Sequence, residues 1–465
     1  MSTFHWTDAR VREALGLRLD RVRGEVEFAG VSTDSRTLEE GELYVALVGD
    51  RFDGHGFVAE AFARGAGAAV VSRPVEGEST QLYLVDDTLG ALGALASYRR
   101  KKLAVPVVGI TGSVGKTSTK DLTRGALSGA LRVHATEGNR NNRVGLPLTL
   151  LETPESAEAV VLELGTNEPG EIATLAAVAR PDVGVVTTVG ESHLEKLGSV
   201  RGVLEEKLEL LRGLAAGGQC VVGDEPELLA KEARKVCPEV RVAGWSERAD
   251  EALRPGDVEV DTWGVHRVRW RGHMVKLRLP GRHAVTNALL ALAVAELLGV
   301  DAGVAVKGLA EVEGGPLRGE IRQVGGLTLI VDCYNANPPS VRAALDVLEG
   351  YGGARRVAVL GTMLELGSAS RSLHRDVLRD ALSRDVDLVV ATGEFARVDV
   401  PGDVGRDRLL SADDWAGAYP SLRERLGGDE VVLLKASRGV AMEGILGRLD
   451  ADFGSPAEAD TEEVS

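Results

Sequence analysis

The fold is decided by the stretch Val105-Pro-Val-Val-Gly-Ile-Thr-Gly-Ser-Val-Gly-Lys-Thr-Ser-Thr-Lys-Asp121. Its apolar start predicts a short buried strand, and a glycine-rich turn then leads into a helix that begins near Lys116 and continues through Leu127. Such a turn can cradle a phosphate, because backbone N–H groups and the helix dipole both favour an anion there. Lys116 would reach the terminal phosphates, and Thr117 would offer its hydroxyl to Mg²⁺.

This loop is a variant of the usual phosphate-binding pattern. The strict pattern places a glycine five residues before Gly115, but this chain has Ile110 there, which leaves Gly-x-x-Gly-Lys-Thr. The alternative is a glycine-rich turn with an exposed lysine. The order of strand, turn, Lys-Thr pair and helix favours a phosphate site over that alternative.

The composition sets limits on the class of protein. At 465 residues, the chain is long enough for three domains of roughly 100–200 residues each. Its 44% apolar and 27% charged residues are typical of a globular protein. The net charge of −16 argues against a nucleic-acid partner, which would need a basic surface. No run of ~20 apolar residues is present, so we expect no membrane span.

Two further features indicate a cytoplasmic protein. The first residues, Met-Ser-Thr-Phe-His-Trp-Thr-Asp, contain no apolar segment of the kind that a secretion signal needs. The three cysteines, Cys220, Cys237 and Cys333, are widely spaced and suit a reducing compartment. Together with the phosphate loop, these features predict a cytoplasmic protein that uses a nucleotide.

The first hundred residues carry short helix and strand signals. We expect strands at 41–48 and 66–71, a helix at 58–64 and another at 91–102, where a basic run marks a domain boundary near 103. Two polar clusters stand out in this part, Ser32-Thr-Asp-Ser-Arg36 and Asp53-Gly-His-Gly56. On their own, both clusters are typical of turns rather than of a binding site.

Two strands of the middle third end at polar residues. The apolar run 159–164 contains Glu163, a carboxylate that is costly to bury unless it is paired or binds a metal. The run 183–189 is a second strand, and His193 follows it. In open α/β sheets, ligands bind at the carboxyl ends of the strands. We therefore expect Glu163 and His193 to meet the phosphate loop there, although a histidine taken alone is more often structural.

A lysine occupies the apolar face of the next predicted helix. That face is formed, at helical spacing, by Val200, Val203, Leu204, Leu210, Leu211 and Leu214. Lys207 lies on the same face, where a free ammonium group is costly to bury. Either its stem packs there while its charged end reaches water, or its charge has been changed or paired.

The region from 241 to 279 predicts a small β insertion or sheet extension, and after the break at Pro280-Gly281 a helix runs through Leu298. His283 and Asn287 lie four residues apart on one face of that helix. These two side chains either cap the helix and pack, or contact the edge of a base.

The last third predicts a doubly wound α/β domain with a parallel core. Its predicted strands are 328–332, 357–360, 388–392 and 431–435, and its predicted helices are 340–349, 372–383 and 413–426. No Gly-x-Gly-x-x-Gly follows the first strand, so a dinucleotide site is not indicated. The strand ends instead carry the polar runs 332–338, 361–367 and 435–438.

Taken together, these stretches resemble the Mur ligases of cell-wall synthesis over about residues 30–445. The resemblance is carried by the phosphate loop and by the runs Asp34-Ser-Arg36, Asp53-Gly-His55, Gly138-Asn-Arg-Asn-Asn142, Asp332-Cys-Tyr-Asn-Ala-Asn-Pro338 and Met363-Leu-Glu-Leu-Gly367. The last two runs are the most specific. The Asp-Asn-Pro-Arg motif of the relatives that add diaminopimelate or lysine is missing from the sequence.

The resemblance implies an α/β protein of three domains. They are a UDP-sugar-binding domain (1–103), a central P-loop ATPase-like domain (104–315) and a C-terminal Rossmann-like doubly wound domain (316–452), with hinges near 103 and 316. The remaining residues, 453–465, form an acidic tail that we expect to be disordered.

The resemblance also implies the activity. It indicates an ATP-dependent ligase that joins D-alanyl-D-alanine to UDP-N-acetylmuramoyl-tripeptide through an acyl phosphate. Its partners would be these two substrates, and we expect a monomer. Whether the third residue of the tripeptide is diaminopimelate or lysine stays open.

Roles for individual residues follow from the same resemblance. Thr117 and Glu163 would hold one Mg²⁺, and Glu163, His193 and a carbamylated Lys207 would hold a second. Lys116, His193 and Lys207 would serve catalysis. The residues that would bind ATP are Gly112, Ser113, Val114, Gly115, Lys116, Thr117, Ser118, His283, Asn287, Arg318 and Asp332. Those that would bind the sugar-peptide or acceptor substrate are Ser35, Arg36, Asn139, Asn142 and Asn335.

The sequence departs from the family pattern at three positions. Val114 replaces a small polar residue, Thr362 replaces an aspartate and Ala436 replaces a glycine. The first takes part through its backbone, so we expect little effect. The other two lie in the domain that would receive the dipeptide, so they bear on the choice of acceptor.

The sequence disfavours two alternative functions. A different amide ligase on the same scaffold, such as a folylpolyglutamate synthase or a cyanophycin-type ligase, is disfavoured by the Asp-Ser-Arg and Tyr-Asn-Ala-Asn-Pro runs. A nucleotide-binding regulator without ligase activity is disfavoured because Lys116, Glu163, His193 and Lys207 are all present.

Overall fold

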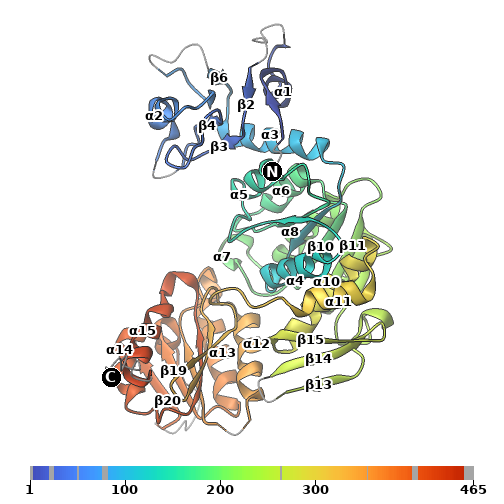
Figure 1. Cartoon of the computed structure of the whole chain (residues 1–465). Coiled ribbons are helices and arrows are strands. Elements are labelled where there is room, and N and C mark those ends of the chain that lie inside the picture. The colour runs from blue at the N-terminus through green and yellow to red at the C-terminus, as the bar shows by residue number, and fades with distance from the viewer. Residues whose placement is uncertain are drawn as a thin grey trace, which may run out of the picture.

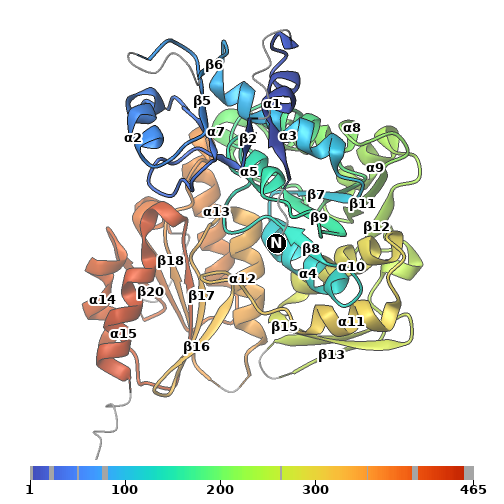
Figure 2. The same ribbon diagram turned by 45° about the horizontal axis from the view of Figure 1, so that its top comes forward.

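The computed structural model describes residues 4–19, 26–49, 52–75, 82–261, 264–352, 354–400 and 407–454. These residues form three α/β units in chain order, which Figures 1 and 2 show in blue, green to yellow, and orange to red. The predicted three-domain α/β architecture is confirmed. The boundaries at 103 and 315 stay predictions, and residues 455–465 of the predicted acidic tail lie outside the described residues.

The N-terminal unit contains a parallel four-stranded sheet in the order β3-β4-β5-β6, beside the short pair β1-β2. Its elements are β1 (Trp6–Thr7), α1 (Asp8–Ala14), β2 (Glu27–Phe28), β3 (Val31–Ser32), β4 (Leu43–Val45), η2 (Gly54–Phe57), α2 (Val58–Ala63), β5 (Ala68–Val71), β6 (Leu82–Leu84) and α3 (Thr88–Lys102). Helix α3 begins three residues before its predicted start because the Asp87 side chain accepts a hydrogen bond from the Leu89 N–H.

The central unit has a six-stranded parallel sheet in the order β12-β11-β10-β7-β9-β8. Its elements are β7 (Val107–Thr111), α4 (Lys116–Ser128), β8 (Val133–Ala135), α5 (Gly145–Leu151), β9 (Ala159–Glu163), α6 (Glu171–Ala179), β10 (Val183–Val186), α7 (Leu194–Leu197), α8 (Val200–Arg212), β11 (Gln219–Gly223), α9 (Glu227–Val236) and β12 (Arg241–Ala243). Strand β7 lies between β9 and β10, so the three strands end at one edge of the sheet.

The β insertion follows this sheet and forms its own antiparallel layer, β13-β14-β15. Its elements and the helices after it are η3 (Glu251–Leu253), β13 (Val258–Val260), β14 (Val265–Trp270), β15 (His273–Pro280), α10 (Arg282–Leu297) and α11 (Ala302–Ala310). The first strand of the predicted insertion, β12, instead joins the central sheet. Helix α10 is almost entirely buried and packs against α4, which places its first turn beside the phosphate loop.

The C-terminal unit has a six-stranded sheet in the order β16-β17-β21-β18-β19-β20, which is parallel except for β16. Its elements are β16 (Glu320–Val324), β17 (Leu327–Asp332), α12 (Pro338–Gly350), β18 (Arg356–Leu360), η4 (Gly367–Ala369), α13 (Ser370–Ser383), β19 (Leu388–Thr392), η5 (Gly393–Arg397), β20 (Leu409–Ala412), α14 (Trp415–Arg423), β21 (Val431–Lys435), η6 (Arg438–Val440), η7 (Met442–Gly444) and α15 (Ile445–Phe453). Strands β16 and β20 and helix α15 were not predicted.

The units are joined in two different ways. One apolar cluster contains side chains of α3, such as Leu92 and Leu95, together with Leu150 of α5 and Leu175 of α6. The N-terminal and central units therefore share a core. The apolar clusters of the C-terminal unit are separate and, in the part of the chain that the structure describes, take in only Leu194 from the central unit. Within the described ranges, no helix is both long and apolar enough to span a bilayer.

Candidate active site

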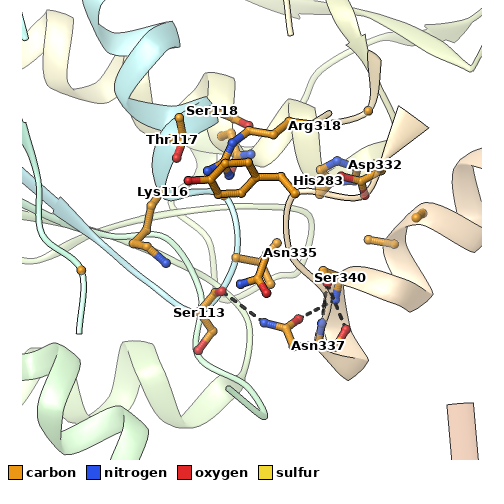
Figure 3. A pocket seen from close by; sticks show the side chains of 18 of the residues that line it. Ser113, Lys116, Thr117, Ser118, His283, Arg318, Asp332, Asn335, Asn337 and Ser340 are labelled. Carbon is orange, nitrogen blue, oxygen red and sulfur yellow. Dashed lines mark hydrogen bonds between the residues drawn. The ribbon is translucent and has the colours of Figure 1, made fainter. Parts of the chain in front are cut away.

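A cleft of about 500 Å³ lies where the central and C-terminal units meet. It is lined by the phosphate loop and by segments that follow the carboxyl ends of β9, β10, β17, β18 and β21, together with the start of α10. Figure 3 shows side chains of both units pointing into it. Because loops from two units build this cleft, its shape depends on how the units are docked.

The phosphate loop is held closely against the end of β10. Gly112 has a φ of +153°, and a Cβ atom at this position would lie 1.9 Å from the Thr187 hydroxyl oxygen. Gly115 has a φ of +85° and precedes α4, and its Cβ would lie 2.6 Å from the Asn287 side chain. Only glycine suits these two positions, so the loop backbone can approach both β10 and α10.

Lys116 begins α4, and its Nζ donates a hydrogen bond to the Gly112 carbonyl at 2.8 Å. Burial lowers the pKa of Lys116, while the nearby Glu163 carboxylate opposes that shift. The ammonium group of Lys116 therefore lies over the glycine-rich turn, where it would contact an anion bound by the loop.

Glu163 ends β9 and is paired at both of its oxygens. Thr117 Oγ1 donates to Glu163 Oε2 at 2.8 Å, and Asn141 Nδ2 donates to Glu163 Oε1 at 2.7 Å. The carboxylate is only 2% exposed, so these bonds offset the cost of burying it. Sequence reasoning missed Asn141, although it lies in the quoted run 138–142.

His193 precedes α7 with a φ of +52°, and its Nδ1 lies 2.5 Å from Oε2 of Glu365 in the C-terminal unit. This close contact with His193 lowers the pKa of Glu365. The Glu195 N–H also donates to the Glu365 carbonyl at 3.1 Å. Sequence reasoning quoted the run around Glu365 but gave this residue no role, because local patterns do not show which loops of different units meet.

Lys207 lies on α8 behind the cleft wall and is 0% exposed. Its Nζ has no hydrogen-bond partner among the described residues. Burial, followed by the positive charge of Lys116, lowers the pKa of Lys207 well below its usual value. The interpretation in which its charged end reaches water is therefore wrong, and the neutral amine is the favoured form.

Polar residues of both units form the rest of the cleft. The Arg318 guanidinium lies 3.8 Å from the centre of the Tyr334 ring. Asp332, at the end of β17, accepts a hydrogen bond from Lys435 Nζ at 2.6 Å. The Asn337 amide donates to the Ser113 carbonyl at 3.3 Å, so the C-terminal unit contacts the phosphate loop directly (Figure 3).

The structure brings most of the predicted site residues together. The predicted residues that line the cleft are Ser113, Val114, Gly115, Lys116, Thr117, Ser118, Asn139, Asn142, Glu163, His193, His283, Asn287, Arg318, Asp332 and Asn335. Gly112 and Lys207 lie behind this lining. Ser35 and Arg36 lie in the N-terminal unit outside the cleft, where Arg36 forms an exposed ion pair with Asp34 at 2.6 Å.

The donor atoms at Glu163 suit Mg²⁺, which prefers oxygen ligands. The Thr117 hydroxyl and the Glu163 carboxylate lie side by side on the cleft wall. Among the described residues there is no group of three or more histidine, cysteine, aspartate or glutamate side chains that could hold a metal. A modification of Lys207 that carries oxygen atoms would add ligands, and its buried amine, which has no hydrogen-bond partner among the described residues, fits such a modification.

Three family models match this chain between residues 27 and 438. The family model described as Mur ligase family, catalytic domain, matches residues 27–100. The model for the Mur ligase middle domain matches residues 110–295, and that for the Mur ligase, glutamate ligase domain, matches residues 317–438.

Individual relatives are similar over nearly their full length. A UDP-N-acetylmuramoyl-tripeptide–D-alanyl-D-alanine ligase of Bacillus subtilis (strain 168) is 37% identical over 428 residues, which cover 90% of this chain and 92% of the relative. Crystal structure I of MurF from Acinetobacter baumannii has a TM-score of 0.88 and 32% identity, covering 97% and 100% of the two chains. The MurF ligase of Thermotoga maritima in complex with ADP has a TM-score of 0.81 and 29% identity, covering 91% and 97%.

Proposed function

The chain belongs to the Mur ligase family, and on that premise we propose that it joins D-alanyl-D-alanine to UDP-N-acetylmuramoyl-tripeptide. The protein is an ATP-dependent ligase that forms a C–N bond in peptidoglycan synthesis. The observation that carries this function is the cleft itself. It brings a phosphate loop with Lys116, a paired Glu163 and the polar loops of a second α/β unit into one site.

The proposed reaction has two steps. The terminal carboxylate of the tripeptide attacks the γ-phosphorus of ATP, so that ADP leaves and an acyl phosphate forms. The amine of D-alanyl-D-alanine then attacks the acyl carbon, and inorganic phosphate leaves while the amine gives up a proton. Both steps need a site without water, because water would hydrolyse the acyl phosphate.

The first step brings two anions together, so positive charge near the phosphates lowers the barrier most. Lys116 supplies that charge from the protein, and the backbone of residues 112–118 holds the phosphates in place. Mg²⁺, when bound, would neutralise phosphate charge, with Thr117 and Glu163 as its protein ligands. Asn141 orients the Glu163 carboxylate for this task.

We assign Lys207, modified to a carbamate, as a ligand of a second metal ion. A neutral amine can add CO₂ and lose a proton, which converts the neutral group into a carbamate anion that a metal can hold. The buried position of Lys207 and the absence of a hydrogen-bond partner for its Nζ within the described residues support this assignment. His193 and Glu163 would share the ion with this carbamate.

The remaining substrate contacts are distributed over the three units. We assign the ATP phosphates to Gly112, Ser113, Val114, Gly115, Lys116, Thr117 and Ser118, and the rest of the nucleotide to His283, Asn287, Arg318 and Asp332. Ser35 and Arg36 are assigned to the UDP-sugar, and Asn139, Asn142 and Asn335 to the peptide end of the substrates. The enzyme is proposed to act as a monomer in the cytoplasm, where ATP is available.

Release of ADP tests the function. The assay contains ATP, Mg²⁺ and UDP-N-acetylmuramoyl-tripeptide, with or without D-alanyl-D-alanine. We expect ADP release to depend on the dipeptide and to match the amount of pentapeptide product. ADP release without any dependence on the dipeptide would contradict the proposal and favour a nucleotide-binding regulator.

A further inference from the structure

Among the described residues that line the cleft, one cation has no role in the proposed reaction. The lysine and arginine side chains that line the cleft are Lys116, Arg318, Lys435 and Arg438. Lys116 serves the phosphates, and Arg318 stacks on Tyr334 beside the nucleotide residues. Lys435 is buried between Asp332 and the Asn335 carbonyl, so its charge is already neutralised. Arg438 is left for a further anion.

The guanidinium of Arg438 is accessible to a ligand. It follows β21, and 57% of its side chain is exposed. Among the described residues, the guanidinium of Arg438 forms an ion pair with the carboxylate of Glu443 at 2.6 Å. Glu443 does not line the cleft. An exposed pair of this kind contributes little to stability, so a ligand carboxylate can compete with Glu443 for the guanidinium.

Arg438 and Glu365 occupy adjoining loops with a fixed relative position. Their loops follow β21 and β18, which pair in the sheet with Leu360 opposite Lys435. The Leu364 N–H donates to the Ser437 hydroxyl at 2.9 Å. Glu365 and Arg438 are the next residues of the two loops, so this hydrogen bond holds a carboxylate and a guanidinium on one wall of the cleft.

Glu365 lies on the side of this wall that faces the central unit. Its side chain contacts His193, and its carbonyl accepts the hydrogen bond from the Glu195 N–H. Glu365 and Lys116 line the same cleft, so this carboxylate and the phosphate loop face one site. The Glu365 carboxylate therefore lies on the side of this wall nearer the central unit, and Arg438 lies on the adjoining loop of the same wall.

The acceptor of the proposed reaction is a dipeptide with an ammonium group at one end and a carboxylate at the other. Extended, its two residues span roughly 7 Å. The reacting amine must lie near the phosphates, and the terminal carboxylate must point away from them. A guanidinium fork matches a carboxylate with two parallel hydrogen bonds.

We infer that Arg438 binds the terminal carboxylate of the incoming dipeptide and that Glu365 receives its ammonium end. This inference rests on the proposed ligase function and adds the residues that select the acceptor. It predicts that tight binding requires a free C-terminal carboxylate on the dipeptide. It also predicts that Arg438 is the residue that recognises this carboxylate.

The test compares two acceptors, D-alanyl-D-alanine and its C-terminal amide, in the wild-type enzyme and in Arg438→Met. Loss of a charged hydrogen-bonded contact raises KM at least about tenfold. We expect wild-type KM to rise by that factor for the amide. In Arg438→Met, KM for the free acid should rise about as much, and the amide should then be no worse than the acid. Arg438→Lys should fall between wild type and Arg438→Met.

Arg397→Met is the matched control, because Arg397 also pairs with a nearby glutamate, is 62% exposed and lies outside the cleft. It should leave both KM values unchanged. Glu365→Gln should raise KM for the acid and the amide by the same factor, since it affects the other end of the dipeptide. The KM for ATP reports whether Arg438→Met retains its fold, and it should not change.

Two results would overturn the inference. If Arg438→Met still prefers the acid over the amide as strongly as wild type does, Arg438 does not bind the carboxylate. If the variant raises KM for ATP as much as KM for the dipeptide, its effect is structural. Both results leave the ligase function standing, whereas a wild-type enzyme without dipeptide-dependent ADP release would remove the function and the inference together.

Discussion

Single residues in this protein gain their properties from what surrounds them. Lys207 shows this most clearly, because the sequence places it on an apolar helix face but leaves open whether its charged end reaches water. The structure buries the amine without a partner among the described residues. A buried amine favours its neutral form, and the neutral form is the one that reacts with CO₂.

Replacement of Lys207 by alanine should abolish ligation. We expect ADP release to fall at least about a hundredfold, because a ligand of the proposed second metal is lost. Excess bicarbonate should not restore activity. Lys235→Ala, which removes an exposed lysine paired with Glu232, serves as the control. Full activity in Lys207→Ala would reject the carbamate.

The carbamate itself can be observed without measuring activity. Wild-type protein in ¹³C-bicarbonate should show a carbamate carbon signal by NMR, and Lys207→Ala should lack it. A wild-type spectrum that is identical to that of the variant would show that Lys207 is unmodified.

His374 predicts a pH dependence of stability. It is buried under the loop that carries Glu365, where its Nε2 accepts the Met363 N–H at 2.9 Å and its Nδ1 donates to the Ser370 carbonyl at 2.7 Å. Burial lowers the pKa of His374 below its usual value of 6.5. The unfolded chain therefore binds a proton below pH 6.5 before the folded one does, so this contribution to stability is present above pH 6.5 and decreases as the pH falls.

Urea unfolding at pH 7.5 and pH 5.5 tests this expectation. The wild type should lose more stability between the two pH values than His374→Gln does, although the variant should be less stable at pH 7.5. The exposed His5 provides the control, because His5→Gln should leave the wild-type difference unchanged. Equal losses in wild type and His374→Gln would contradict the prediction.

At the level of elements, the sequence predicted the parallel cores and the helix after the phosphate loop, because periodicity and turn residues are local signals. It missed the antiparallel edge strand β16, which forms a hairpin with β17, and the short β20, which pairs with the preceding strand β19. Both strands are mostly unburied, so they lack the apolar run that marks a buried strand. It also missed the roles of Asn141 and Glu365. Their contacts depend on how loops of different strands and units are placed, which no local pattern records.

One side chain connects two elements beside the cleft. Glu206 of α8 is buried and accepts hydrogen bonds from the Gly170 and Ile172 N–H groups, at 2.7 and 2.8 Å, at the start of α6. It thereby anchors the segment after Glu163, whose residues Gly165 to Asn167 line the cleft.

Glu206→Ala should lower the free energy of unfolding by about 2–3 kcal/mol, because two buried N–H groups lose a charged acceptor. Urea unfolding measures the change. Glu205→Ala removes the neighbouring carboxylate of the same helix, which pairs with Arg212 at the surface, and should change stability by less than about 0.5 kcal/mol. Similar losses in both variants would show that Glu206 has no special role.

At the scale of the whole molecule, the two expected hinges are not equivalent. The apolar cluster shared by α3, α5 and α6 disfavours free movement near residue 103. The C-terminal unit contacts the central one through polar groups such as those of Asn337 and Glu365, and among the described residues its apolar clusters take in only Leu194 of the central unit. Movement near residue 316 would therefore expose little apolar surface.

Small-angle scattering should detect this difference. Addition of a non-hydrolysable ATP analogue, Mg²⁺ and the UDP-linked substrate should change the scattering curve, and rotation of the C-terminal unit alone should account for the change. The curve with ADP alone is the control for nucleotide binding. A change that requires movement of the N-terminal unit would contradict this expectation, as would no change at all.

The separate packing of the C-terminal unit, in contrast to the shared core of the first two units, also suggests how such enzymes diversify. A unit that is held by a few polar bonds can be exchanged during evolution without rebuilding a hydrophobic interior. Recombination near residue 316 would then combine a new C-terminal unit, with a new acceptor specificity, with an unchanged ATP-binding unit. New substrates would arise by exchange of whole domains.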